Sequence, residues 1–268
     1  LSRGLGDVYK RQTDWSLYDF NNIKFNGLEN FRRLFSEKTF AIAIKNTFYF
    51  AIVTVLIKNI FGFLMALIVK KTSKFNTLLR AVVFLPMTIS VMVVAIIFVS
   101  IYNPTNGIIN EGLRAIGLDS LTRDWLFDAR YSMNSICLMD IWQGTGFTMC
   151  VMISGLQAIP TDYYEAAKID GADKWQQLRY VTLPLLISSI TISLVFNIIS
   201  GFKVFAQVYS TTNGGPADST HVLGTFLFKS FGNGFLGYSA AVGLFTTVLI
   251  VALSMTLLAI LRKREVEY

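Results

Sequence analysis

The chain has 268 residues, of which 53% are hydrophobic and 15% are charged, and its mean hydropathy is +0.51. This composition is too apolar for a soluble domain of the same length and indicates an integral membrane protein. The net charge of +7 does not indicate nucleic-acid binding, because the basic residues cluster beside apolar runs, where they determine topology and contact lipid headgroups.

The chain begins with polar residues. Residues 1–12 contain no apolar core of the kind found in a signal peptide. Their last part, GDVYKRQ, resembles translated sequencing-adaptor read-through, so we interpret residues 1–12 as a non-native leader. Residues 13–46 are expected to form an external segment that precedes the first span.

Five apolar runs follow, and each has the roughly 20 residues that a membrane-spanning helix needs. Helices are expected because backbone polar groups in lipid must be satisfied within the spanning segment. The predicted fold is therefore an all-α integral membrane bundle. The expected spans are residues 47–69, 81–101, 133–153, 185–208 and 240–261.

A polar, amphipathic segment separates the third span from the fourth. It covers residues 157–184 and reads QAIPTDYYEAAKIDGADKWQQLRYVTLP. Asp162, with Glu165 three positions later, predicts a capping box at the start of a short helix. Gly171 is expected to end that helix in the left-handed conformation, and a second short helix is expected over residues 173–180.

The spacing of residues in this segment follows a known pattern. Glu165-Ala166-Ala167, three residues, Gly171, nine residues, Val181, one residue and Leu183-Pro184 resemble the EAA signature of ABC importer permeases, with valine in place of isoleucine. In that family this segment is the cytoplasmic coupling helix, which docks on the ATP-hydrolysing subunit. Without the resemblance, it would be an ordinary capped helix-turn-helix on a membrane surface. The resemblance implies as ATPase-coupling residues Glu165, Ala166, Ala167, Asp170, Gly171, Leu183 and Pro184.

A second signature lies near the end of the chain. Asn213-Gly214-Gly215-Pro216, followed by Gly237-Tyr238-Ser239-Ala240-Ala241, resembles the sugar-importer branch of the same family, although Ala206 stands where that branch usually has aspartate. The resemblance covers about residues 25–264, and it implies a permease transmembrane domain over residues 47–264. Because the family usually has one more span before the matching region, six spans are expected in the intact protein.

Polar and aromatic residues inside the third and fourth spans indicate a candidate substrate path. In the sugar-importer branch the equivalent helices supply a site near the middle of the membrane, where aromatic rings pack on sugar C–H groups and amides bind hydroxyls. The other interpretation is helix packing at Gly144 and Gly201, and in some importers only the sister subunit binds substrate. The candidate path residues are Trp142, Gln143, Gly144, Phe147, Asn197, Ser200 and Gly201.

Two further side chains carry expectations of their own. Lys58 lies inside the first span, where we expect it to pair with an acid or a carbonyl in the bundle, or to reach the interface by snorkelling, rather than to line the transport path. His221 is the single histidine, and we expect it to be solvated in a loop rather than to be a ligand.

Basic density near the span ends, together with the resemblance, predicts the topology. Residues 70–80, residues 157–184 and the tail from Arg262 are expected to be cytoplasmic, and residues 102–131 and 209–237 external. The protein is expected in a bacterial or archaeal cell (inner) membrane, which it crosses several times.

The predicted function is that of a permease subunit of a binding-protein-dependent ABC importer for a sugar or sugar derivative. The resemblance implies as partners a sister permease, two ATP-binding ABC subunits, an extracellular or periplasmic substrate-binding protein and the bilayer, but no nucleic acid. No cofactor, metal or catalytic residue is expected, and the absence of a phosphate-loop motif assigns ATP hydrolysis to a partner. The alternatives are an ion-coupled secondary transporter, with Lys58 or Lys203 as the coupling charge, and a membrane enzyme.

Overall fold

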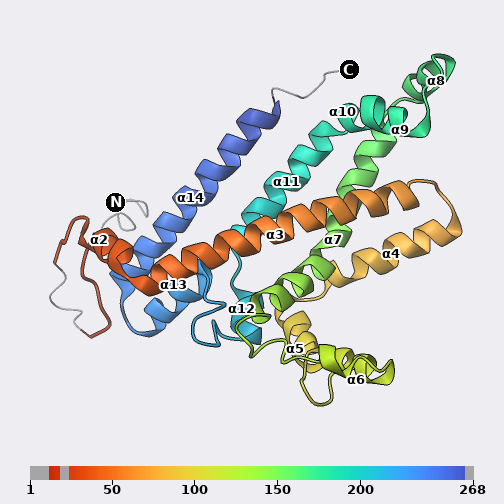
Figure 1. The fold of residues 1–268 in the computed structure, drawn as a ribbon. Helices are drawn as coiled ribbons and strands as arrows, with labels where there is room; N and C mark the ends of the chain where they lie inside the picture. The colour runs from red at the N-terminus through yellow and green to blue at the C-terminus, as the bar shows by residue number, and fades with distance from the viewer. Residues whose placement is uncertain (1–11, 19–23, 263–268) are drawn as a thin grey trace. The chain divides into compact units, whose positions relative to one another are not determined.

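The computed structural model describes residues 12–18 and 24–262, so the predicted leader lies outside the described residues except for Gln12. An isolated antiparallel bridge joins Thr13 to Phe25, and the named elements of the described residues are all helices. In chain order (Figure 1), the helices are α2 (Glu29–Ser36), α3 (Lys38–Val69), α4 (Lys74–Thr88), α5 (Val91–Ile101), α6 (Ile108–Ala115), η1 (Asp119–Leu121), α7 (Ser132–Ala158), α8 (Thr161–Ile169), α9 (Lys174–Gln177), η2 (Leu178–Thr182), α10 (Leu183–Leu185), α11 (Ile187–Phe202), α12 (Ala206–Thr211), α13 (Leu223–Gly232) and α14 (Leu236–Arg262).

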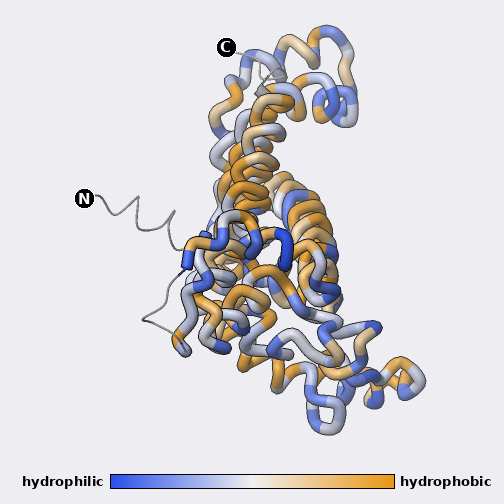
Figure 2. Tube along the Cα trace, turned by 90° about the vertical axis from the view of Figure 1, so that its left-hand side faces the viewer, coloured by the Kyte–Doolittle hydropathy of each residue, from blue (hydrophilic) through white to orange (hydrophobic). Residues whose placement is uncertain are grey.

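The long helices confirm the predicted all-α membrane class. Within the part of the chain that the structure describes, three helices, α3, α7 and α14, are long and apolar enough to cross a membrane, and up to five spans result if two broken helix pairs each count as one. Figure 2 shows apolar residues running along these helices and polar residues gathering in the connections.

Two predicted spans are not continuous helices. The span expected over residues 81–101 breaks after Thr88, where Pro86 lies in the last turn of α4 and α5 begins only at Val91. The span expected over residues 185–208 ends at Phe202, and α12 is a separate short helix. Lys203, which is exposed and directly follows the end of α11, marked this second break within the apolar run.

The chain divides into two compact units whose sequence segments interleave. The first comprises residues 1–51, 91–139 and 200–251. In this unit α2 and the start of α3 pack with α13 and the start of α14 around a core of Leu34, Phe40, Ala43, Leu223, Phe226, Tyr238, Ala241 and Val242. The Asn46 side-chain amide adds hydrogen bonds to the carbonyls of Ser219 and His221, at 3.0 and 2.9 Å, and so ties the 213–221 loop to α3.

The second unit comprises residues 52–90, 140–199 and 252–268. In Figure 1 the second half of α3 and the whole of α4 form an antiparallel hairpin, whose turn is closed by Arg80 donating to the carbonyl of Val69 at 2.6 Å. Small residues permit close helix contacts, because a Cβ at Gly146 would lie 2.2 Å from the carbonyl oxygen of Val83 and one at Gly155 would lie 2.0 Å from Ser189 Oγ.

Candidate coupling segment and substrate path

The segment between α7 and α11 begins with α8. Its N-cap is Pro160, which makes no side-chain cap hydrogen bond, so the predicted capping box of Asp162 with Glu165 is wrong. The capping box belongs instead to α9, where Asp173 Oδ1 accepts from the Gln176 amide at 2.7 Å and Gln176 Oε1 accepts from the Asp173 amide at 2.8 Å. Aspartate three positions before glutamine satisfies the same rule, so this signal was present in the sequence.

Gly171 forms the turn between α8 and α9. Its φ of +78° confirms the predicted left-handed conformation, and the Ala172 amide donates to the carbonyl of Ala167 at 2.8 Å to close α8. A Cβ added to Gly171 would meet nothing within 4 Å in this chain. The turn is therefore open, and a larger side chain there would project from the surface.

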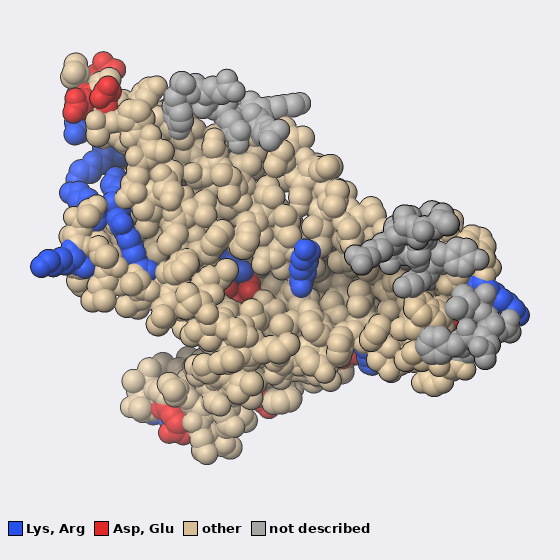
Figure 3. Space-filling view, turned by 180° about the vertical axis from the view of Figure 1, so that it is seen from behind, with Lys and Arg blue, Asp and Glu red and all other residues tan. Residues whose placement is uncertain are grey.

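The segment between α7 and α11 is rich in polar residues, but its surface also carries large exposed apolar and aromatic side chains. Ile169 is 86% exposed and Trp175 is 67% exposed, and Tyr163 and Tyr180 are also exposed. Among the predicted coupling residues, Glu165, Ala166, Asp170, Gly171 and Leu183 are exposed, and Ala167 and Pro184 are half-buried. Figure 3 shows basic side chains gathered at the same end of this unit, with acidic ones beside them. The segment thus carries exposed aromatic, aliphatic and charged side chains on one surface.

The second predicted helix of the segment is only partly an α-helix. The α-helical part, α9, ends at Gln177, and the chain continues as the π-helical turn η2 and then the short α10. A bend of 64° at buried Leu186 separates this stretch from α11. The expected apolar stripe is not buried as a unit, because Trp175 is exposed while Leu178 and Val181 are half-buried.

The candidate path residues of α7 point in different directions. Trp142 is exposed, whereas Gln143 is buried and its side-chain amide donates to the carbonyl of Ile89 at 2.9 Å, where α4 ends. Phe147 lies against Phe196 of α11, with ring centroids 4.2 Å apart. The structure therefore assigns Gln143 a protein partner and leaves the ring of Trp142 on the helix surface.

Asn197 belongs to a buried chain of polar groups that joins three helices. Its side-chain amide donates to Thr148 Oγ1 at 3.0 Å and to Ser193 Oγ at 3.3 Å, and Ser193 Oγ donates to Asn59 Oδ1 at 2.8 Å. These bonds link α11 to α7 and α3. Ser200 and Gly201 lie further along α11, in the residues of the first unit, where Ser200 is exposed and Gly201 is buried.

Lys58 pairs with Asp140, which confirms the expected partner for an intramembrane lysine. Lys58 Nζ lies 2.5 Å from Asp140 Oδ2, and the two side chains are only 4% and 9% exposed. The lysine stem crosses α7 at Gly144, where a Cβ would lie 2.8 Å from Lys58 Cε. Gly144 thus makes room for the ion pair. The sequence contained both charges, but hydropathy alone does not reveal that they meet.

His221 is buried, so the expectation of a solvated histidine is wrong. It is 2% exposed, and its Nδ1 lies 2.8 Å from Thr225 Oγ1. Within the described part of the chain, its Nε2 has no hydrogen-bond partner. Burial lowers the pKa of His221; nearby Lys229 acts in the same direction, while Asp218 and Glu37 oppose the shift. Gly214 covers the ring, since a Cβ there would lie 2.7 Å from Nδ1.

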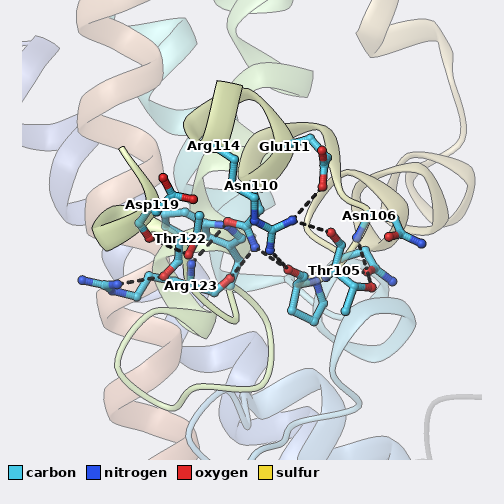
Figure 4. A network of polar contacts seen from close by, with 11 residues as sticks. Thr105, Asn106, Asn110, Glu111, Arg114, Asp119, Thr122 and Arg123 are labelled. Atoms are coloured by element: carbon cyan, nitrogen blue, oxygen red, sulfur yellow. Dashed lines mark hydrogen bonds and ion pairs between the residues drawn. The ribbon is translucent and has the colours of Figure 1, made fainter. Parts of the chain in front are cut away.

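The predicted external loop 102–131 is held by a polar network (Figure 4). Asn110 is buried, and its side-chain amide donates to the carbonyls of Pro104 and Arg123, at 3.1 and 2.9 Å. Its Oδ1 accepts from Trp125 Nε1 at 2.8 Å. Arg114 pairs with Glu111 at 2.6 Å and donates to the carbonyl of Thr105 at 2.7 Å. These hydrogen bonds hold residues 102–131 in a defined conformation, and we refer to this loop as the ordered cap.

Known proteins match this chain over most of its length. Residues 58–266 match the family model described as binding-protein-dependent transport system inner membrane component. The probable ABC transporter permease protein YurN of Bacillus subtilis is 38% identical over 94% of this chain and 86% of its own length. The trehalose/maltose transport system permease protein MalF of Thermococcus litoralis is 32% identical over 90% and 81%.

The fold also matches a solved structure. One chain of a bacterial ABC transporter involved in the import of the acidic polysaccharide alginate superposes with a TM-score of 0.82. The match covers 98% of this chain and 90% of that chain, at 23% identity. At this identity, the likeness is evidence for the fold.

Proposed function

Since the chain belongs to the family of inner membrane components of binding-protein-dependent transport systems, we propose that this ABC importer permease translocates a sugar or sugar derivative. The name of the Thermococcus litoralis relative, a trehalose/maltose permease, supports the substrate class. Exposed Trp142 supports it as well, because an aromatic face packs on sugar C–H groups. The family does not favour an ion-coupled secondary transporter, and ATP hydrolysis belongs to separate subunits.

The proposal includes a complete importer around this chain. Its partners are a sister permease, two ATP-binding subunits and an external substrate-binding protein. When ATP closes the two ATP-binding subunits, the segment 157–184 moves with them and the bundle opens toward the loaded binding protein. The Trp142 side of α7, backed by Gln143 and Asn197, would contribute to the sugar path.

The observation that carries the coupling assignment is the exposed surface of α8 and its turn. Ile169 and Trp175 present large apolar side chains in a segment that is otherwise polar, and Gly171 stands open between them. Exposed apolar groups of this kind mark interaction sites. The missing capping box removes a local structural role for Glu165, which leaves its exposed carboxylate for contact with the ATPase.

Replacing Gly171 by leucine tests this assignment. The side chain would project into the space where the ATPase packs, so Gly171→Leu should detach the ATPase from the purified membrane complex while the spans still insert. Gly117→Leu is a matched control, because Gly117 also has a left-handed backbone, with φ of +77°, and nothing within 4 Å of its Cβ. Both variants carry the same backbone penalty of about 1–2 kcal/mol.

Co-purification of the ATPase is the measurement. Detachment by Gly171→Leu, with retention by Gly117→Leu on the opposite predicted side of the membrane, is the expected pattern. Retention of the ATPase at wild-type levels by Gly171→Leu would refute the coupling assignment of residues 157–184.

A further inference from the structure

One side chain of α8 faces the interior of its unit while its neighbours face outward. Tyr164 is half-buried and packs against a cluster that includes Leu156, Ile159 and Leu186. Tyr163 and Glu165, on either side of it, are exposed. Tyr164 therefore anchors α8, which carries the proposed ATPase contact, to the apolar core of the second unit.

The hydroxyl of Tyr164 reaches the chain that leads into α11. It lies 3.1 Å from Thr182 Oγ1, and the two residues are 18 positions apart. Thr182 is buried and is the last residue of the π-helical turn η2. Its hydroxyl also lies 3.3 Å from the carbonyl of Gln177, across that turn. Thr182 thus connects α8 to the end of η2 by a side-chain contact.

The backbone route between α8 and α11 is irregular. It passes through the open left-handed turn at Gly171, the π-helical turn η2 and the bend of 64° at Leu186. Isolated π-helical turns occur frequently at functional sites. A displacement of α8 could be absorbed by rotation at the Gly171 turn, because that turn has open space around it. The Tyr164–Thr182 contact bypasses the turn.

We propose that the Tyr164–Thr182 contact is the tie by which movement of α8 is transmitted to α11. The proposal rests on the proposed coupling function of residues 157–184. Tyr164 and Thr182 are positioning residues, because they make α8 and the start of α11 move together. With the tie removed, α8 keeps its outer surface and its ATPase, but it moves about the Gly171 turn without carrying α11.

The test removes single hydroxyl groups from the complete importer. Tyr164→Phe and Thr182→Val each delete one partner of the contact and keep the shape of the side chain. Tyr163→Phe is the matched control, since it deletes the same hydroxyl from the exposed neighbouring tyrosine. Thr182→Ser keeps the hydroxyl and should behave as wild type. The reporter is Lys203→Cys, placed just beyond α11 at an exposed position, in a chain with Cys137 and Cys150 replaced by serine.

The measurement is the labelling rate of the reporter by an impermeant maleimide, with and without Mg-ATP and vanadate. In the parent complex, nucleotide trapping should change this rate. In Tyr164→Phe and Thr182→Val the change should shrink about threefold to tenfold, as expected for the loss of one hydrogen bond. The double variant should be no worse than either single variant, because both remove the same contact.

The outcomes separate this proposal from the proposed function. ATPase co-purification with Tyr164→Phe, together with a smaller nucleotide response, supports the tie. An undiminished response in Tyr164→Phe and Thr182→Val overturns it, as does a parent complex that shows no response. Loss of the ATPase from Tyr164→Phe also overturns it, because Tyr164 would then act in docking. The proposed coupling function has its own test: it fails if Gly171→Leu retains the ATPase.

Discussion

At the scale of single residues, the Lys58–Asp140 pair places two opposite charges in the buried contact between α3 and α7. Both charged side chains are buried, so each depends on the other for compensation of its charge. Removing one partner leaves an uncompensated buried charge, which destabilises the protein. The side chains come from α3 and α7, so the pair also sets how these helices face each other. Gly144 is required at the crossing because the lysine stem fills the space of a Cβ.

Neutralising one member of this pair should be more damaging than neutralising both. Lys58→Met or Asp140→Asn should destabilise the protein by about 3–5 kcal/mol, and Lys58→Met with Asp140→Leu should recover most of the loss. Lys203→Met is the control, because Lys203 is exposed. Thermal inactivation of the detergent-solubilised protein measures the effect. A loss in the double variant equal to the sum of the two single losses would mean that the pair is not coupled.

His221 predicts a pH dependence of stability. Burial favours the neutral ring, so its pKa in the folded protein lies below its ordinary value. The unfolded chain then binds a proton more readily, and the stabilisation present above the unfolded pKa of about 6.5 is lost as the pH falls through that value toward the folded pKa.

The measurement compares thermal midpoints of wild type and His221→Gln at neutral pH and at lower pH values. Because the chain contains a single histidine, the difference between the two pH profiles reports on His221. His221→Gln should show a flatter profile over this range. Parallel profiles would show that His221 does not titrate during unfolding.

At the scale of elements, α7 has two different faces around the middle of the helix. Gln143 and Thr148 face inward and hydrogen-bond to Ile89 and Asn197, so they hold neighbouring elements in place. Trp142 faces outward. A buried side chain that is hydrogen-bonded within the protein must give up that bond to reach a substrate, whereas the exposed face of the Trp142 ring is open to contact.

Alanine substitution should therefore separate these two faces. Trp142→Ala should lower the uptake of labelled disaccharides by about tenfold while the complex still assembles, because the ring supplies a stacking surface for sugar. Asn197→Ala should lower assembly as well as uptake, because the buried hydrogen bonds from Asn197 to Thr148 and Ser193 are lost. Leu138→Ala, also exposed on α7, is the control. Unchanged uptake by Trp142→Ala would favour substrate binding by the sister subunit alone.

At the scale of the whole molecule, the topology is defined by which connections lie on which side of the membrane. The proposed topology places the α3–α4 turn and the coupling segment in the cytoplasm, and the ordered cap of residues 102–131 outside. Basic residues support this orientation, because Lys70, Lys71 and Lys74 are exposed at the α3–α4 turn.

Two matched cysteine substitutions test the topology. Ser73 and Ser120 are both exposed, in the α3–α4 turn and in the cap. In a chain with Cys137 and Cys150 replaced, Ser120→Cys should react with an impermeant thiol reagent in intact cells and Ser73→Cys only after lysis. The opposite pattern would invert the topology and remove the coupling segment from the ATPase side.

The sequence by itself determined the local properties of this protein. The lengths of the apolar runs predicted a helical membrane protein, because a spanning segment must satisfy its own backbone in lipid. The EAA spacing identified the family, and Gly171 was correctly expected in a left-handed turn, since glycine adopts that conformation without steric cost.

Only the tertiary structure decided which distant groups meet. The contact of Asn197 with Thr148 joins residues 49 positions apart, and the pairing of Lys58 with Asp140 depends on how α3 crosses α7. The burial of His221 depends on Asn46 and Gly214 closing around its loop. The breaks near Thr88 and Leu186 lie within apolar runs, where hydropathy has no signal. Such features follow from packing between elements, which a linear pattern does not contain.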